Sequence, residues 1–192
     1  MDEKPDQELI DEVLRGSPSS FEPLVVRYQP RVFATARRYA RRESEVEDIV
    51  QEVFIKAYQK LSTFRGDAPF EHWLMRLATR TCYDFLRKHQ RNREWNTTDL
   101  SSDENDWLEN IGEDTTEQES NQVAAKTLVN RLLEGLSADF RLVITMLDLE
   151  GKSVKEIAEL TEWSESKVKV TAHRARAQMR NLLAKVAPEK YL

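Results

Sequence analysis

Side chains able to do covalent or metal chemistry are scarce in this sequence. The three histidines, His72, His89 and His173, stand far apart and lack the spacing of metal ligands. The single cysteine, Cys82, lies in a segment with helical periodicity and has no obvious base near it in sequence, which favours a thiol in the core. No glycine-rich phosphate loop is present. We therefore expect no enzyme: no catalytic residue, no cofactor and no bound metal.

The chemistry that the sequence does offer is recognition of a polyanion, first of all near the C-terminus. Residues 153–183 read SVKEIAELTEWSESKVKVTAHRARAQMRNLL, the pattern of a helix-turn-helix with a turn at 161–163 and a cap at Ser164. From Ser164 to Lys185 there are 6 Lys or Arg and 1 Asp or Glu. In the docking geometry of this motif, the second helix enters the major groove of duplex DNA.

One side of this second helix is apolar and predicts its packing face. The opposite side and its flanks are the candidate DNA surface, made of Ser164, Ser166, Lys167, Lys169, Val170, His173, Arg174 and Arg176. Lysine and arginine pair with guanine, serine pairs with several bases, and valine suits a thymine methyl group. Arg176 is better placed for phosphates. A solvated basic face or a protein-binding use of the motif stays open.

A second basic stretch, residues 64–93, interleaves positive charge with aromatic rings. Residues 80–93 carry five Lys or Arg against one acidic residue, and rings stand at positions 64, 70, 73, 83 and 85. Single-stranded DNA requires this combination, because each unstacked base offers a π-face and each nucleotide a phosphate. Most of the rings have helical spacing and are expected in the core, whereas Phe64 precedes Gly66 and is expected in a loop.

The segment EDIVQEVFIKAYQKL, residues 47–61, has two faces. Seven apolar residues share one side, as in a buried stripe: Ile49, Val50, Val53, Phe54, Ala57, Tyr58 and Leu61. The other side places Ile55 among Asp48, Glu52 and Gln59. An apolar residue framed by acids and an amide indicates a surface for a protein partner, although a lone exposed isoleucine is also common.

The elements that position these residues are predicted to be helices. Glycine and proline are scarce, at 5 and 6, and the apolar residues follow the helical period. Helices are expected over 6–15, 20–41, 45–62, 68–91, 123–135, 138–149, 153–160 and 164–185. Capping boxes are expected at Ser19, Ser44 and Ser153, and Asp67 is expected to cap the fourth helix.

Charge divides the chain into three parts. Residues 1–95 hold 17 basic and 16 acidic residues, residues 96–122 hold none and 9, and residues 123–192 hold 12 and 9. The net charge of −5 therefore comes from the middle part, which is polar and is expected to be a flexible linker. The predicted fold class is all-α: two small helical domains, 1–95 and 123–192, joined by the acidic linker 96–122.

Location follows from what the sequence lacks. There is no run of about 18 apolar residues, so no membrane span is expected, and the acidic start MDEKPDQELIDEV has no apolar signal stretch. One cysteine excludes an internal disulfide framework and fits a reducing compartment. We expect a cytoplasmic protein.

Taken together, the motifs resemble those of bacterial RNA polymerase sigma factors. The runs DIVQEVFIKAY (48–58), FRGD (64–67), WLMRLA (73–78) and DFLR (84–87) resemble the second conserved region of that family. LSADFR (136–141) and LEGKSVKEIAE (149–159), followed by Val168 and residues 174–176, resemble the fourth region. Only these two regions are present in a short chain, which is the plan of the extracytoplasmic-function (ECF) group.

The resemblance implies an initiation subunit, often of a stress response, that binds core RNA polymerase and directs promoter-specific transcription. The helix at 45–62 would dock on a coiled coil of the largest polymerase subunits through Asp48, Gln51, Glu52, Ile55 and Lys56. Unpaired bases of the minus-ten element would be captured by Phe64, Arg65, Arg76, Arg80, Arg87 and Lys88. The basic C-terminal helix would read the minus-thirty-five element, and the linker would follow the polymerase cleft towards the RNA exit path.

Three positions depart from the family pattern. Arg80 stands where asparagine is usual, and Lys167 and Thr171 stand where threonine and arginine are frequent, so the base preferences need not follow the usual ones. An anti-sigma factor is a further expected partner, because the family often uses one. Two other functions stay open: a conventional helix-turn-helix regulator that works without polymerase, and an interaction adaptor with no DNA role. The acidic linker and residues 64–93 favour the sigma factor.

Overall fold

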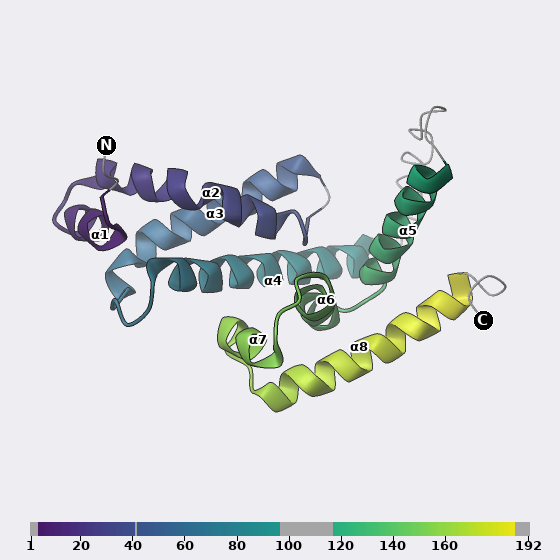
Figure 1. The fold of residues 1–192 in the computed structure, drawn as a ribbon. Coiled ribbons are helices and arrows are strands. Elements are labelled where there is room, and N and C mark those ends of the chain that lie inside the picture. The colour runs from purple at the N-terminus through teal and green to yellow at the C-terminus, as the bar shows by residue number, and fades with distance from the viewer. Residues whose placement is uncertain (1–3, 41, 97–116, 187–192) are drawn as a thin grey trace. The chain divides into compact units, whose positions relative to one another are not determined.

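The structure is a computed structural model that describes residues 4–40, 42–96 and 117–186 (Figure 1). These residues form helices and turns and contain no strand, so the all-α prediction is confirmed. The chain divides into two compact units, the first built on residues up to Leu86 and the second on most residues from Arg87 onward. Of the predicted acidic linker, residues 97–116 lie outside the described residues, whereas 117–122 are helical.

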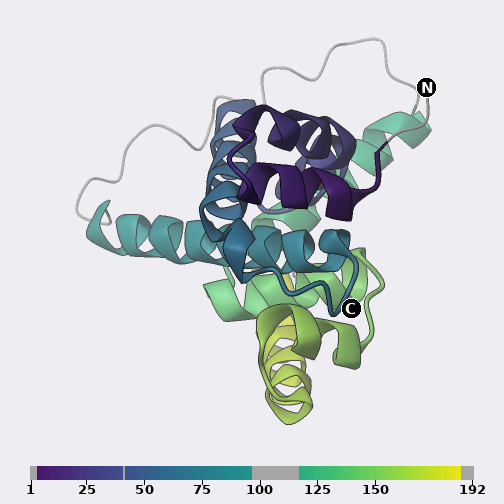
Figure 2. The same ribbon diagram turned by 90° about the vertical axis from the view of Figure 1, so that its left-hand side faces the viewer.

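The part of the first unit up to Leu86 comprises three α-helices, most of a fourth and two short 3₁₀ turns. They are α1 (Asp6–Leu14), η1 (Pro18–Phe21), α2 (Glu22–Ala36), α3 (Glu43–Lys60), η2 (Leu61–Thr63) and α4 (Phe70–Asn96). Helices α2 and α3 run side by side (Figures 1 and 2). Each helix buries apolar residues at intervals of three and four, such as Val46, Ile49, Val50 and Val53 of α3. Cys82 is buried, as predicted for a core thiol.

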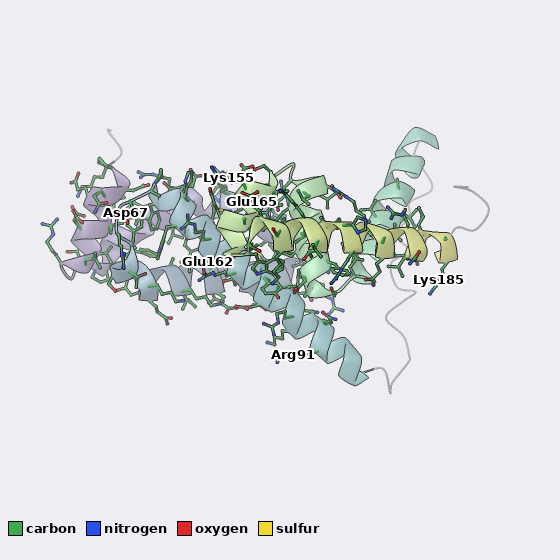
Figure 3. The ribbon with its side chains drawn as sticks, turned by 90° about the horizontal axis from the view of Figure 1, so that it is seen from below. Asp67, Arg91, Lys155, Glu162, Glu165 and Lys185 are labelled. Atoms are coloured by element: carbon green, nitrogen blue, oxygen red, sulfur yellow. The ribbon has the colours of Figure 1, made fainter. Side chains whose placement is uncertain are left out.

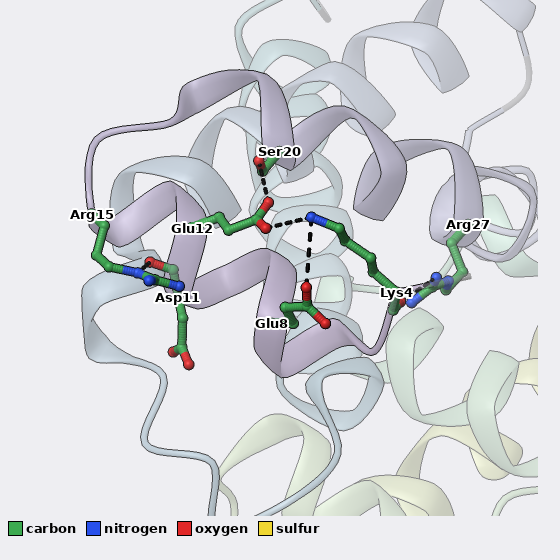
Figure 4. A network of polar contacts seen from close by, with 7 residues as sticks. All are labelled: Lys4, Glu8, Asp11, Glu12, Arg15, Ser20 and Arg27. Atoms are coloured by element: carbon green, nitrogen blue, oxygen red, sulfur yellow. Dashed lines mark hydrogen bonds and ion pairs between the residues drawn. The ribbon is translucent and has the colours of Figure 1, made fainter. Parts of the chain in front are cut away.

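Helix α1 is fastened to the start of α2 by polar contacts (Figure 4). The Glu12 carboxylate pairs with Lys4 and accepts a hydrogen bond of 2.7 Å from the Ser20 hydroxyl. Arg27 of α2 donates to the Lys4 carbonyl oxygen over 2.9 Å and also pairs with Asp6, whose carboxylate accepts from the Tyr28 hydroxyl as well. These bonds fix α1 at the edge of the unit where the 64–69 loop passes.

Three predicted helix starts are wrong. Helix α2 begins at Glu22 because Pro18 opens a 3₁₀ turn, so Ser19 caps nothing. Helix α3 begins at Glu43, and the Glu45 carboxylate accepts a hydrogen bond from the Arg42 amide over 3.2 Å, so the predicted box of Ser44 and Glu47 does not start this helix. Helix α4 begins at Phe70, which leaves Asp67 in the preceding loop.

The second unit is also helical. Its elements are α5 (Glu117–Glu134), α6 (Ala138–Ile144), the π turn η4 (Thr145–Leu149) and α8 (Glu165–Val186), with α7 (Val154–Thr161) between the last two in sequence. Helices α5, α6 and α8 share an apolar core of Leu133, Leu136, Ile144 and Ala175, against which Phe140, Met179 and Leu182 pack. This core holds the basic helix α8, whose two ends are marked by Glu165 and Lys185 in Figure 3.

The helix-turn-helix prediction agrees with the local structure of α7, the turn and α8. The Ser153 hydroxyl accepts from the Glu156 amide, and the Glu156 carboxylate accepts from the Ser153 amide over 2.8 Å, which confirms this capping box. Glu162 ends α7 in the left-handed conformation, with φ of 60°, and reverses the chain. Ser164 follows and stands directly before α8.

Candidate functional site

A groove of about 550 Å³ lies on the surface of the first unit, along the line where α2 and α3 meet. Its apolar lining comes from η1 and both helices, namely Phe21, Val25, Phe33, Val50, Phe54, Ile55 and Tyr58. Ile55 is 48% exposed and Tyr58 is 44% exposed. The polar rim includes Gln29, Glu47, Gln51 and Gln59. An apolar floor with a polar rim is the composition of a protein-binding surface.

The five predicted polymerase contacts lie on or beside this groove. Gln51 and Ile55 line it, whereas Asp48 and Glu52 are exposed on the same helix and do not line it. Lys56 is half-buried and tied down: its Nζ lies 2.7 Å from Glu52, 3.3 Å from the Thr81 hydroxyl and 3.7 Å from Asp84. Lys56 therefore connects α3 to α4.

Tyr58 corrects the predicted buried stripe of α3. The other six apolar residues of that stripe are buried or half-buried, whereas the Tyr58 ring lies at the surface and packs edge-on against Phe21, with ring centroids 5.2 Å apart. Its neighbour Phe21 comes from η1, a turn that the sequence pattern of α3 alone does not reveal. Sequence reasoning missed the groove for the same reason.

A cluster of aromatic rings stands where α4 begins. Phe64 lies in the loop, as predicted, and is half-buried. Its ring meets Phe70 at 5.6 Å and Trp73 at 5.7 Å, both edge-on, and Phe70 also meets Tyr28 of α2 at 5.5 Å. Such edge-on contacts fix the plane of the Phe64 ring. A hollow of about 380 Å³ lies beside it, between the loop and α1.

Basic residues form a stripe along α4. Arg76, Arg80 and Arg87 are exposed at spacings of four and seven, so they share one face of the helix, and Lys88 is exposed next to them. Arg65 is exposed in the loop. Arg91 is exposed on the same face and extends the stripe to about 22 Å. It was not among the predicted site residues, although its spacing of four from Arg87 was a sufficient signal.

Helix α8 has the predicted two faces. Val168, Ala172 and Ala175 are buried, and Met179 and Leu182 are half-buried. All eight candidate DNA residues of this part of the chain are exposed, and Val170 is 49% exposed. Thr171 is buried, so this departure from the family pattern lies on the packing side, unlike Lys167.

Arg176, one of the predicted DNA contacts, forms an ion pair with Asp148 of the π turn. Its guanidinium reaches both oxygens of Asp148, at 2.5 Å and 3.3 Å. The hydrogen bond to Asp148, with the attraction between the two charges, raises the pKa of Arg176 above its ordinary value. Arg176 therefore stays charged, and one carboxylate partly neutralises the field that it offers to a phosphate.

Two further findings bear on the class of protein. Within the described ranges, no helix is both long and apolar enough to cross a membrane. The same residues contain no group of three or more His, Cys, Asp or Glu side chains placed to hold a metal ion.

Comparison with known proteins identifies the class. The family model Sigma-70 region 2 matches residues 24–92, and Sigma-70, region 4 matches residues 126–179. The ECF RNA polymerase sigma-E factor of Escherichia coli (strain K12) is 34% identical over 178 residues, which cover 92% of this chain and 93% of that protein. The factor of the same name from Haemophilus influenzae (strain ATCC 51907 / DSM 11121 / KW20 / Rd) is 34% identical over 181 residues, covering 92% and 94%.

Solved structures agree with this class. CnrH, solved in complex with the cytosolic domain of CnrY, is 26% identical, with a TM-score of 0.54 over 95% of this chain and 99% of that one. The sigma factor RpoE of Bartonella quintana, solved with the anti-sigma factor NepR, is 21% identical and shares the fold, with a TM-score of 0.53 over 85% and 96%. The chain belongs to the ECF group of RNA polymerase sigma factors, which are DNA-binding initiation factors.

Proposed function

We propose that this sigma factor binds core RNA polymerase through the α2–α3 groove and the exposed acids beside it. The observation that carries the proposal is the placement of Ile55 and Gln51 on an apolar groove that is open to solvent. A helix of the polymerase would bury Ile55 and Tyr58 there, while Asp48 and Glu52 would meet basic residues at the rim. Apolar anchors with a charged rim give both affinity and orientation.

The test is a double variant, Asp48→Arg with Ile55→Glu. We expect loss of co-purification with core polymerase, by at least about a hundredfold in affinity, because a charge is buried and another is reversed. The fold should persist, since both side chains are exposed. The matched control is Glu8→Arg with Leu14→Glu on α1, where Leu14 is 51% exposed and outside the groove. Unchanged binding by the first variant would refute this surface.

We propose that the loop and helix at 64–91 capture unpaired bases of the minus-ten element. Phe64 would stack on a base, and the stripe of Arg76, Arg80 and Arg87 would follow the phosphates. Stacking is worth about 1–3 kcal/mol per base, against about 1.4 kcal/mol per base step lost from the duplex. The two terms nearly cancel, so contacts made by polymerase are needed to open a promoter.

We propose that α8 reads the minus-thirty-five duplex through its exposed face. Arg174→Ala should weaken binding of the holoenzyme to promoter duplex by about tenfold if it contacts a base. Arg15→Ala on α1 removes the same charge from the other unit and serves as control. Promoter affinity that is equal in both variants would remove Arg174 from the site.

The remaining parts of the proposal follow from membership of the group. We infer that the chain is not an enzyme, that it acts in the cytoplasm, and that residues 1–95 and 123–192 work as separate domains on either side of the linker 96–122. An anti-sigma factor is a proposed regulator, since RpoE of Bartonella quintana was solved with one. Membership of the sigma family favours this function over a helix-turn-helix regulator that works without polymerase.

A further inference from the structure

The hollow beside Phe64 has one wall that does not come from the loop. It is lined by Phe64, Phe70 and the loop residues Gly66 to Pro69, and on the other side by Asp6 and Gln7 of α1. Gly66 has φ of 75°, a backbone conformation that residues with a side chain rarely adopt. The Gln7 Oε1 atom lies 3.6 Å from the position that a Cβ atom on Gly66 would take. Helix α1 and the loop therefore enclose this space together.

The orientation of the Gln7 amide is set by its neighbour on α1. Gln7 Nε2 donates a hydrogen bond of 2.9 Å to the Asp11 carboxylate, which lies one turn further along the helix. An ionised carboxylate only accepts hydrogen bonds, so the amide nitrogen must face Asp11. The amide oxygen therefore faces the hollow, where it offers an acceptor.

The charged side chains that line the hollow are both carboxylates. Asp6 is held by Arg27 and Tyr28, and this anchors the start of α1. Asp67 is exposed in the loop (Figure 3) and adds a second carboxylate. The Asp67 carboxylate would repel a phosphate, whereas a flat base fits a hollow with aromatic rings on one side and the Gln7 acceptor on the other.

We propose that Gln7 is a specificity-determining residue for the base that Phe64 captures. Its Oε1 accepts a hydrogen bond from the exocyclic amine of adenine or cytosine. Guanine and thymine carry a keto oxygen at the equivalent ring position, which meets the same acceptor unfavourably. The inference rests on the proposed capture of minus-ten bases by the 64–91 segment and adds which bases the hollow prefers.

The experiment uses holoenzyme assembled from this chain and core polymerase, with a promoter library whose minus-ten region is randomised. Sequencing the transcribed templates gives the base preference at each position. The position whose preference disappears in Phe64→Ala is the captured base, and this assignment does not depend on Gln7. At that position we expect the native chain to favour adenine or cytosine, and Gln7→Ala to reduce that preference by about fivefold, the effect of one hydrogen bond.

Two further variants separate specificity from folding. Asp11→Asn lets the neighbour donate as well as accept, so the Gln7 amide can turn, and we expect guanine and thymine to become better tolerated at the same position. Glu8→Gln, an exposed change on the same helix and outside the hollow, should leave the profile unchanged.

The outcomes distinguish the two proposals. If Phe64→Ala removes a preference that Gln7→Ala retains, the role of Gln7 is refuted and base capture stands. A native preference for guanine or thymine at that position has the same consequence. If Phe64→Ala alters no position, both proposals are refuted.

Discussion

At the scale of single residues, Tyr28 shows how a half-buried polar pair positions the site. Burial and the hydrogen bond that its hydroxyl donates to Asp6 raise the pKa of Tyr28 to about 12. The folded chain therefore favours the neutral hydroxyl. Asp6 opens α1, so this bond holds α1 beside the hollow.

This pKa gives a prediction for stability at high pH. Because the pKa of Tyr28 is raised in the folded chain, its contribution to the free energy of unfolding is complete below about pH 10, where an unperturbed tyrosine titrates. This contribution is lost as the pH rises through about 12. Tyr28→Phe should therefore lose less stability than the native chain between these two values. Denaturant unfolding at several pH values measures the difference, and parallel losses in the two proteins would contradict it.

Individual residues also show how much of the structure can be predicted from the sequence. Periodicity correctly placed Ile55 on the exposed side of α3 and Cys82 in the core, because both depend only on the phase of one helix. It failed for Tyr58, whose exposure depends on how η1 packs against α3. Gln7 gave no signal, since its proximity to Gly66 joins segments far apart in the chain.

At the scale of elements, polar contacts hold α8, the second helix of the helix-turn-helix, to other segments of its own unit. The pair between Arg176 and Asp148 ties α8 to the π turn, and Gln178 donates to the Gly135 carbonyl oxygen over 2.9 Å. The Asp148 carboxylate both orients Arg176 and offsets its charge.

Asp148→Asn tests the balance between these effects. Removing one negative charge beside Arg176, a proposed phosphate contact, should strengthen duplex binding and make the slope of log affinity against log salt steeper by up to about one unit. The stability of the unit should change by less than about 1 kcal/mol, because the pair is half exposed. A salt titration of promoter-duplex binding gives the slope, and a shallower slope than that of the native chain would show that orientation of Arg176 matters more than its charge.

Elements were predicted well where local chemistry is strong. The Ser153 box and the turn at Glu162 depend on a few consecutive residues, and both agree with the sequence pattern. The box at Ser44 was wrong because Arg42 adopts an extended conformation, with ψ of 138°, and its amide reaches Glu45 over 3.2 Å.

At the scale of the whole molecule, we propose that the distribution of charge limits DNA binding by the free chain. The nine acidic residues of 96–122 make the net charge of the chain negative, although α4 and α8 each carry a basic face. Within one chain, such a segment repels free DNA through long-range electrostatics. On this proposal, specific binding would depend on the additional contacts that polymerase supplies.

Replacing those nine acids by the corresponding amides tests this idea. The net charge would change from −5 to +4, and we expect the free chain to bind random duplex about tenfold more tightly at low salt, with the difference shrinking as salt is added. Fluorescence anisotropy with a random-sequence duplex measures it. A chain with nine neutralised acids outside this segment is the control, and equal affinities for the native and linker variants would refute the idea.

The edge-on contact of Phe64 with Trp73 has a practical consequence. A base that stacks on Phe64 alters the surroundings of an indole ring, so strand opening carries a built-in optical signal. With the other three tryptophans replaced by phenylalanine, Trp73 emission in a stopped-flow instrument would time the arrival of the first base without any dye on the DNA.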